Sequence, residues 1–344
     1  MLNAAERVAS DAMRRPRVLF CGLEFEDGYA HTRAYVDDND IDVDVARCAR
    51  EDVAREISRC DVAVPLMTKL DAELLKIGAA GALTHVLQFG VGLEGVDIEC
   101  ATALGVTVAR IPSEKTGNAT STAELAVYLV LAALRRHDAM SASVRSRKLG
   151  APTGNALSEC EVMILGWGAI GVKIAARLRG FECALTAARK SKWAEDESDR
   201  CGIPLRAVCG TSDRDGLRAL LRAADVVCVA CTQDASNAGM IDDEFLAAMK
   251  PGAALVNIAR GGLFDRDAVL KSLKSGHLGY LASDVAWSEP VDPEDPIVRH
   301  EHTYFTPHIA GVTHSSYRMM GEIVATSASR LVEFRKLTDI QVVN

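Results

Sequence analysis

The stretch EVMILGWGAIGVKIAARL, residues 161–178, contains the pattern that decides the fold. An apolar run of strand length, Glu161–Leu165, leads into a glycine-rich turn, and the helical spacing that follows predicts a helix over Ile170–Leu178. In such a turn one glycine permits the tight bend, another leaves room for a pyrophosphate, and a third lets the helix pack closely on the strand. Unpaired N–H groups at the helix N-terminus attract phosphate oxygens. These residues predict a dinucleotide site at Gly166, Gly168, Ala169, Ile170 and Gly171.

Strand-length apolar runs alternate with helix-length segments on both sides of this turn, a pattern typical of parallel α/β sheets. Long helices are predicted over Thr122–Arg136, opened by a capping box of Ser121 and Glu124, and over Ser315–Arg335. We therefore expect an α/β protein with two Rossmann-like, doubly wound parallel-sheet domains linked by long helices. The predicted strands are Arg17–Cys21, Val62–Met67, Thr84–Phe89, Val106–Ala109, Glu161–Leu165, Cys183–Ala187, Asp225–Ala230, Ala253–Ile258 and Leu278–Ser283.

Composition excludes several classes of partner. The 344 residues carry a net charge of −8, which argues against a nucleic acid or an anionic membrane surface, because both need a basic face. No apolar run approaches the ~20 residues needed to span a bilayer. Ten cysteines indicate a reduced intracellular protein, and no metal site is predicted, since Cys228 and Cys231 would point to opposite faces of a strand. We expect a cytoplasmic protein, although residues 1–16 leave organellar import open.

The residues after the second strand of this domain bear on cofactor choice. NAD sites usually place an acidic residue there, about 20 residues beyond the glycine turn, to accept from the ribose hydroxyls. Here the place is taken by Arg189, followed by Lys190, Ser191 and Lys192. A guanidinium can hold a 2′-phosphate with two hydrogen bonds. We therefore predict NADP(H), contacted by Arg189, Lys190 and Lys192; a solvated basic loop with NAD still bound is the alternative.

Arg260 follows another predicted strand, in the segment Asn257–Gly262. Ligands of open α/β sheets bind beyond the carboxyl ends of the strands, so this side chain should face the cofactor cleft. There its guanidinium could hold a carboxylate with two parallel hydrogen bonds. A surface salt bridge is the alternative role for this arginine taken alone.

A histidine and two carboxylates follow further along the chain. Asp284 and Glu289 come after the strand Leu278–Ser283, and His308 lies within Pro307–Gly311. Reduction of a keto group needs a proton donor at the oxygen, and histidine suits that role near neutral pH. A carboxylate such as Glu289 would orient the ring and favour its protonated form. His308 alone would also fit a structural loop histidine.

Four ordered motifs, Gly166–Gly171, Asn257–Gly262, Glu289–Pro290 and Pro307–Gly311, resemble those of the D-isomer-specific 2-hydroxyacid dehydrogenase family. The resemblance covers roughly residues 60–335 and includes Val91–Asp97, which is similar to the family's substrate-carboxylate loop. The chain departs from the family at Cys231–Asp234, where a proline-rich stretch is usual.

The resemblance implies roles for individual residues. It makes Arg260, Glu289 and His308 the catalytic residues. The backbone N–H groups of Val91 and Gly92 would bind the substrate carboxylate. The resemblance places Asp284 at the nicotinamide carboxamide and Thr122 near the cofactor. Further cofactor contacts are implied at Thr232, Ile258 and Ala259.

The resemblance also implies a discontinuous substrate-binding domain, 1–117 completed by 312–344, and a dinucleotide-binding Rossmann domain, 118–311. Such proteins form dimers through the cofactor domain, which would suit the apolar helix Thr122–Arg136. We therefore expect a homodimer.

The predicted function is reduction of a small 2-oxo acid of the glyoxylate or hydroxypyruvate class with NAD(P)H, the reaction of a D-2-hydroxyacid dehydrogenase. A D-3-phosphoglycerate dehydrogenase is one alternative, although Pro65 and Gln88 occupy places where those enzymes carry arginines for the substrate phosphate. An NAD(H)-sensing binding protein that resembles the family's corepressors is an alternative from another class.

Overall fold

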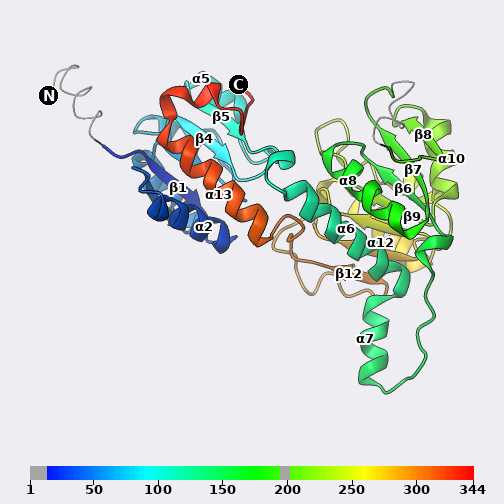
Figure 1. Ribbon diagram of the computed structural model, residues 1–344. Helices are drawn as coiled ribbons and strands as arrows, with labels where there is room; N and C mark the ends of the chain where they lie inside the picture. Colours follow the sequence, from blue (N-terminus) through cyan, green and yellow to red (C-terminus); the bar gives the residue numbers. More distant parts are fainter. Residues whose placement is uncertain (1–13, 194–201) are drawn as a thin grey trace. The chain divides into compact units, whose positions relative to one another are not determined.

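The computed structural model describes residues 14–193 and 202–344. The chain divides into two compact units, one formed by residues up to Asn118 together with Val312–Asn344, the other by Ala119–Gly311. The boundary predicted after residue 117 lies one residue before this division. The long helices α6 (Asn118–Arg135) and α13 (His314–Ser329) begin within a few residues of the two points of division (Figure 1).

The first unit contains a six-stranded sheet of order β13-β5-β4-β3-β1-β2, parallel except for β13. Alternate residues of β1 face two separate cores: Val18 and Phe20 pack with α13, whereas Leu19 and Cys21 pack on the opposite face. The strands are β1 Arg17–Cys21, β2 Asp44–Cys48, β3 Val62–Val64, β4 His85–Gln88, β5 Thr107–Arg110 and β13 Gln341–Val342. Within the described residues of this unit, the α-helices are α2 Glu26–Asp38, α3 Val53–Glu56, α4 Ala72–Ala79, α5 Ile98–Ala103 and α13.

The second unit contains a fully parallel seven-stranded sheet of order β12-β11-β10-β9-β6-β7-β8. The chain moves outward from β6 through β7 to β8 and then returns to place β9 on the other side of β6, which creates a topological switch point. The strands are β6 Glu161–Leu165, β7 Ala184–Arg189, β8 Ala207–Gly210, β9 Val226–Val229, β10 Ala254–Asn257, β11 Tyr280–Ser283 and β12 Thr303–Phe305. The helices include α6, α7 His137–Arg145, α8 Ala169–Leu178, α10 Arg214–Ala223, α11 Asp243–Ala248 and α12 Arg266–Ser275.

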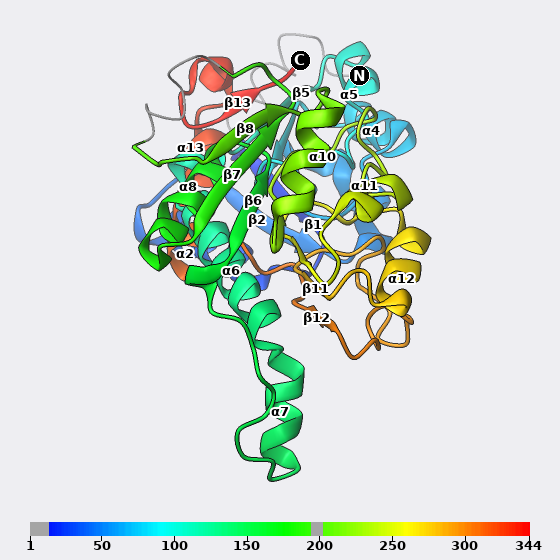
Figure 2. The same ribbon diagram turned by 90° about the vertical axis from the view of Figure 1, so that its right-hand side faces the viewer.

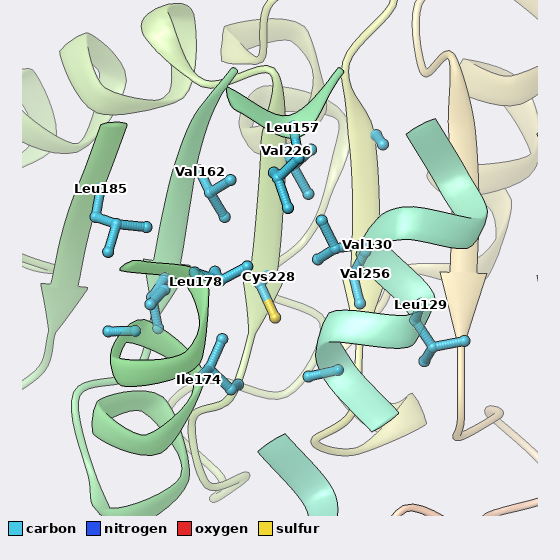
Figure 3. Close-up of a cluster of buried hydrophobic side chains, with 14 of the residues drawn as sticks. Leu129, Val130, Leu157, Val162, Ile174, Leu178, Leu185, Val226, Cys228 and Val256 are labelled. Atoms are coloured by element: carbon cyan, nitrogen blue, oxygen red, sulfur yellow. The ribbon is translucent and has the colours of Figure 1, made fainter. Parts of the chain in front are cut away.

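Helices cover both faces of this second sheet. Figure 3 shows Leu129 and Val130 of α6 and Ile174 of α8 against strand residues such as Val162. Residues of α10, α11 and α12 form the core on the other face. Both units are thus doubly wound α/β structures, as predicted from the sequence.

Several local predictions were wrong. Helix α6 begins at Asn118, so Ser121 lies inside the helix and cannot form the predicted capping box. The final α-helix ends at Ser329, and a 3₁₀-helix over Leu331–Lys336 follows it. Helix α2 was missed because two of its three buried residues are Gly28 and Thr32, which give no apolar period.

Within the described part of the chain, no helix is long and apolar enough to cross a membrane. Nor do histidine, cysteine and carboxylate groups gather there in a way that would hold a metal ion.

Candidate active site

The glycine-rich turn Gly166–Gly171 joins β6 to α8 at the topological switch point. Gly166 has a φ of 114°, and a Cβ atom there would lie 2.4 Å from the backbone nitrogen of Cys231. A Cβ atom on Gly171 would lie 2.0 Å from the carbonyl oxygen of Gly166. Gly168, which precedes the first residue of α8, instead faces open space with no atom within 4 Å of a Cβ position. Two glycines therefore permit close packing, and the third leaves the room that a pyrophosphate needs at a helix N-terminus.

The basic segment predicted to read the ribose follows β7. Arg189 ends this strand, donates from Nε to the carbonyl of Ser191 at 3.2 Å, and places its guanidinium 4.6 Å from the ring centroid of Trp193. Its Nη2 donates to the carbonyl of Lys192. The guanidinium is thus held on its own loop at the edge of the predicted ribose site.

A carboxylate from a distant part of the chain lies beside this basic segment. Asp234, in the loop after β9, has Oδ2 3.0 Å from Nζ of Lys190, and Lys190 also donates to Oγ of Ser236 at 2.8 Å. The predicted ribose contacts, Arg189, Lys190 and Lys192, therefore have a negative charge beside them. Strand β6 lies between β7 and β9, so only the sheet order brings these residues together.

Arg260 follows β10 in a turn organised by a buried amide. The side chain of Asn257 accepts from the N–H of Ala259 and donates to the carbonyl of Arg260, both at 2.9 Å. Nη1 of Arg260 donates to the carbonyl of Ala259 at 2.7 Å. A Cβ atom on Gly261 would lie 1.9 Å from the carbonyl oxygen of Ala286, so the loop after β11 packs directly on this turn.

Glu289 and His308 are in contact. Nδ1 of His308 lies 2.7 Å from Oε2 of Glu289, while Oε1 of Glu289 accepts from the N–H of Ala286 at 2.9 Å. Burial by itself raises the pKa of Glu289, but the hydrogen bond and charge of His308, the N–H of Ala286 and the charge of Arg260 together lower this pKa below its usual value. Glu289 is therefore ionised near neutral pH, and His308 and Arg260, the other two predicted catalytic residues, both favour its ionised form.

Asp284 anchors the loop that contains the histidine. Its Oδ1 accepts from Oγ1 of Thr306 at 2.6 Å and from the N–H of Ile309 at 2.8 Å, and its Oδ2 accepts from the N–H of Ala310 at 2.8 Å. The carbonyl of Asp284 accepts from the N–H of His308 at 2.8 Å. These bonds hold His308 at its left-handed φ of 55°.

The anchoring contacts bear on the predicted role of Asp284 at the nicotinamide carboxamide. The residue is 1% exposed, and burial raises the pKa of its carboxyl, against the lowering effect of the three hydrogen bonds and of the charge of His308. Three of about four acceptor positions on its carboxylate are used by its own loop. A contact with the nicotinamide stays a prediction.

The other residues predicted to contact the cofactor or the substrate differ in burial and in position. Thr122 is 4% exposed within α6, and the carbonyl of Thr232 accepts from Nδ2 of Asn237 at 2.8 Å. Val91 and Gly92 are half-buried after β4 in the other unit, where Arg110 donates to the carbonyl of Val91 at 3.3 Å. Ile258 and Ala259, at the end of β10, are buried.

The sequence also matches a known protein family. Residues 127–310 match the family model described as D-isomer specific 2-hydroxyacid dehydrogenase, NAD binding domain. The chain belongs to the D-isomer-specific 2-hydroxyacid dehydrogenase family. Membership implies a nicotinamide cofactor, and the open space at Gly168 fits the pyrophosphate of such a dinucleotide.

Curated relatives in this family have two different names. The chain is 31% identical over 295 residues to a D-3-phosphoglycerate dehydrogenase of Archaeoglobus fulgidus, covering 85% of this chain and 53% of that protein. It is 30% identical over 300 residues to a glyoxylate reductase of Korarchaeum cryptofilum, covering 85% of each. The chain thus spans about half the length of the phosphoglycerate dehydrogenases it matches, but most of the glyoxylate reductase.

A solved structure shows the same fold. The apo-structure of D-lactate dehydrogenase from Escherichia coli superposes with a TM-score of 0.78 at 19% identity, covering 95% of this chain and 100% of that one. At this identity the likeness concerns the fold alone.

The two glycines give a matched pair of variants. We expect Gly168→Ala to change the free energy of unfolding by less than about 0.5 kcal/mol, because its Cβ meets no atom, yet to weaken dinucleotide binding at least about tenfold. Gly171→Ala should instead lower the free energy of unfolding by about 1–3 kcal/mol through overpacking. Chemical denaturation followed by tryptophan fluorescence and titration with NADPH measure the two effects. Unchanged nucleotide affinity in Gly168→Ala would contradict the assignment of the pyrophosphate site.

Proposed function

We propose that this chain is a 2-oxoacid reductase that forms a D-2-hydroxy acid, with NADP(H) as its preferred cofactor and NAD(H) as the alternative. The observation that carries the proposal is the contact of His308 with an ionised Glu289 whose charge is also balanced by Arg260. An acid–base histidine, its orienting carboxylate and a carboxylate-binding guanidinium are the groups that reduction of a 2-oxo acid requires.

Each residue has a distinct part in the proposed reaction. The bound nicotinamide would supply a hydride to C2 of the substrate. His308 gives a proton to the carbonyl oxygen as negative charge develops there. Glu289 holds the Nδ1 side of the ring and stabilises its protonated form. Arg260 binds the substrate carboxylate and orients the carbonyl group.

A small, unphosphorylated substrate of the glyoxylate or hydroxypyruvate class fits the first unit best. At the places where we expect phosphoglycerate dehydrogenases to carry arginines, this chain has Pro65 and Gln88. Nε2 of Gln88 already donates to the carbonyl of Leu66 at 3.1 Å. Each missing charge-assisted hydrogen bond to a phosphate would cost about 1.5–3 kcal/mol. Oxidation of D-3-phosphoglycerate is therefore the second candidate, supported by the names of several relatives.

A substrate panel tests this function directly. We expect oxidation of NADPH with glyoxylate or hydroxypyruvate, slower turnover with NADH, and little activity with 3-phosphohydroxypyruvate. Spectrophotometric assays at 340 nm with both cofactors measure these rates. Higher kcat/KM for the phosphorylated substrate would favour the phosphoglycerate dehydrogenase. Tight nucleotide binding with no turnover of any 2-oxo acid would instead favour a nucleotide sensor.

The roles of the histidine and glutamate can be separated by pH. Reduction of a 2-oxo acid consumes a proton, so we expect kcat in this direction to fall as pH rises. His308→Asn should lower kcat about 10²–10⁴-fold. Glu289→Gln keeps a hydrogen-bonding side chain but removes the negative charge beside His308, so the alkaline fall of kcat should begin at lower pH. Single-turnover rates between pH 5 and 9 measure this shift, and an unmoved alkaline limb in Glu289→Gln would exclude the electrostatic role.

The proposal includes a homodimer formed through the cofactor-binding unit. Helix α6 buries Ala126, Leu129 and Val130 on its own sheet and leaves Tyr128 39% exposed, so its predicted contact with a second copy would use the side that carries Tyr128. Helix α7 also projects from the unit (Figure 2). Val144 in this helix and Leu149 just after it are 80% and 102% exposed. Such exposed apolar residues on a projecting element are typical of an interface.

Sedimentation measures the oligomeric state. We expect the wild-type chain to sediment as a dimer and the double variant Val144→Asp/Leu149→Asp to sediment as a monomer, because charges would be buried at the interface. Since both side chains are exposed in the isolated chain, the variant should remain folded. A dimeric double variant would exclude α7 and the segment after it as the interface.

A further inference from the structure

The ion pair between Lys190 and Asp234 joins the loops that follow β7 and β9, on the two sides of β6. Lys190 follows β7, Asp234 lies in the loop after β9, and β6 lies between these two strands (Figure 1). Strand β6 is the one that leads into the glycine turn at Gly166. The 3.0 Å contact of Nζ with Oδ2 therefore spans the carboxyl end of β6, beside the predicted ribose site.

Asp234 is held in place by its own loop. Its Oδ1 accepts from the N–H of Ser236 at 2.7 Å and from the Ser236 hydroxyl, and its own N–H donates to Oδ1 of Asn237 at 2.7 Å. Nδ2 of Asn237 donates to the carbonyl of Thr232. Hydrogen bonds from Ser236 and Lys190 lower the pKa of Asp234 to about 2, so its negative charge is present throughout the neutral range.

The Asp234 carboxylate binds the ammonium group of Lys190, which a 2′-phosphate would need as a partner. A phosphate at the end of β7 would have Arg189 and Lys190 as partners, but Arg189 stacks on Trp193 and Lys190 is bound by Asp234 and Ser236. A dianionic phosphate must therefore compete with the Asp234 carboxylate for the same ammonium group and also lie near that carboxylate. The ribose 2′-hydroxyl of NAD carries no charge and avoids this competition.

We propose that Asp234 is a specificity-determining residue, which limits the preference for NADP(H) by competing with the 2′-phosphate for Lys190. The inference rests on the nucleotide site of the proposed function and goes beyond it in naming a residue from another strand that sets the selectivity. The side chains of Lys190 and Asp234 are 72% and 49% exposed, and exposed ion pairs are weak. A 2′-phosphate can therefore displace the Asp234 carboxylate from Lys190, but NADP(H) then binds less tightly than it would without this carboxylate. The chain would therefore accept both cofactors, with a ratio set by this pair.

The test compares dissociation constants of NADPH and NADH for the full-length protein, measured by nucleotide fluorescence in the absence of substrate. Asp234→Asn keeps an acceptor for Ser236 and removes the charge. We expect it to tighten NADPH binding about threefold to tenfold while changing the NADH constant less than about twofold. The difference should shrink at high ionic strength because the charges are exposed to solvent.

Asp243→Asn is the matched control. Asp243 forms an exposed pair with Lys271 at 2.9 Å on α11 and α12, with side-chain exposures of 66% and 72%. Its removal should leave the ratio of the two dissociation constants unchanged. Arg189→Asp serves a separate purpose: it should weaken NADPH far more than NADH if Arg189 reads the 2′-phosphate as the proposed function states.

The outcomes separate the role of Asp234 from the proposed use of NADP(H). An unchanged ratio in Asp234→Asn, with Arg189→Asp still selectively weakening NADPH, overturns the role of Asp234 and leaves the cofactor proposal standing. Weaker NADPH binding in Asp234→Asn also overturns it, because the carboxylate would then position Lys190 for the phosphate. Equal effects of Arg189→Asp on both nucleotides, or a wild-type chain that binds neither, overturn the cofactor proposal and this inference together.

Discussion

The buried carboxylate of Asp284 is the constraint on which the proposed catalytic geometry depends. It accepts hydrogen bonds from Thr306, Ile309 and Ala310, and its carbonyl accepts from the N–H of His308. A buried carboxylate is costly unless its oxygens are paired, so the loop is held wherever these donors can reach it. That requirement places the histidine at a positive φ, beside Glu289.

The other loops are joined to this one by close backbone packing and by charge. Gly261 allows the Arg260 turn to touch the backbone of Ala286, and the N–H of Ala286 in turn binds Glu289. Arg260 and His308 therefore act on one carboxylate from two strands, β10 and β12, whose carboxyl ends lie at the same edge of the sheet. A parallel sheet collects side chains distant in the sequence at such an edge, which is why the motifs appear in order along the chain.

Many strands of the two sheets could be predicted from the sequence because they are buried on both faces. Continuous apolar runs at Arg17–Cys21 and Glu161–Leu165 gave strands β1 and β6 with the predicted bounds. Helix α2 and the start of α6 were not predictable in this way. Gly28 and Thr32 in α2 lie in close contact with other elements, so the helix is stabilised by tertiary packing rather than by an apolar period, and a serine inside α6 resembled a cap.

The local sequence determined the glycine turn, because only glycine lets backbone and phosphate approach closely. It also determined the order of Arg260, Glu289 and His308, because the chemistry of each side chain depends on residue type. Only the tertiary structure decided what lies beside these groups. Asp234 and Lys190 are 44 residues apart, and nothing in their spacing indicates contact. Their contact follows from the reversal of strand order, which places β7 and β9 on opposite sides of β6. Sequence periodicity describes the environment of a residue along its own element, whereas pairing across a sheet depends on the path of the whole chain.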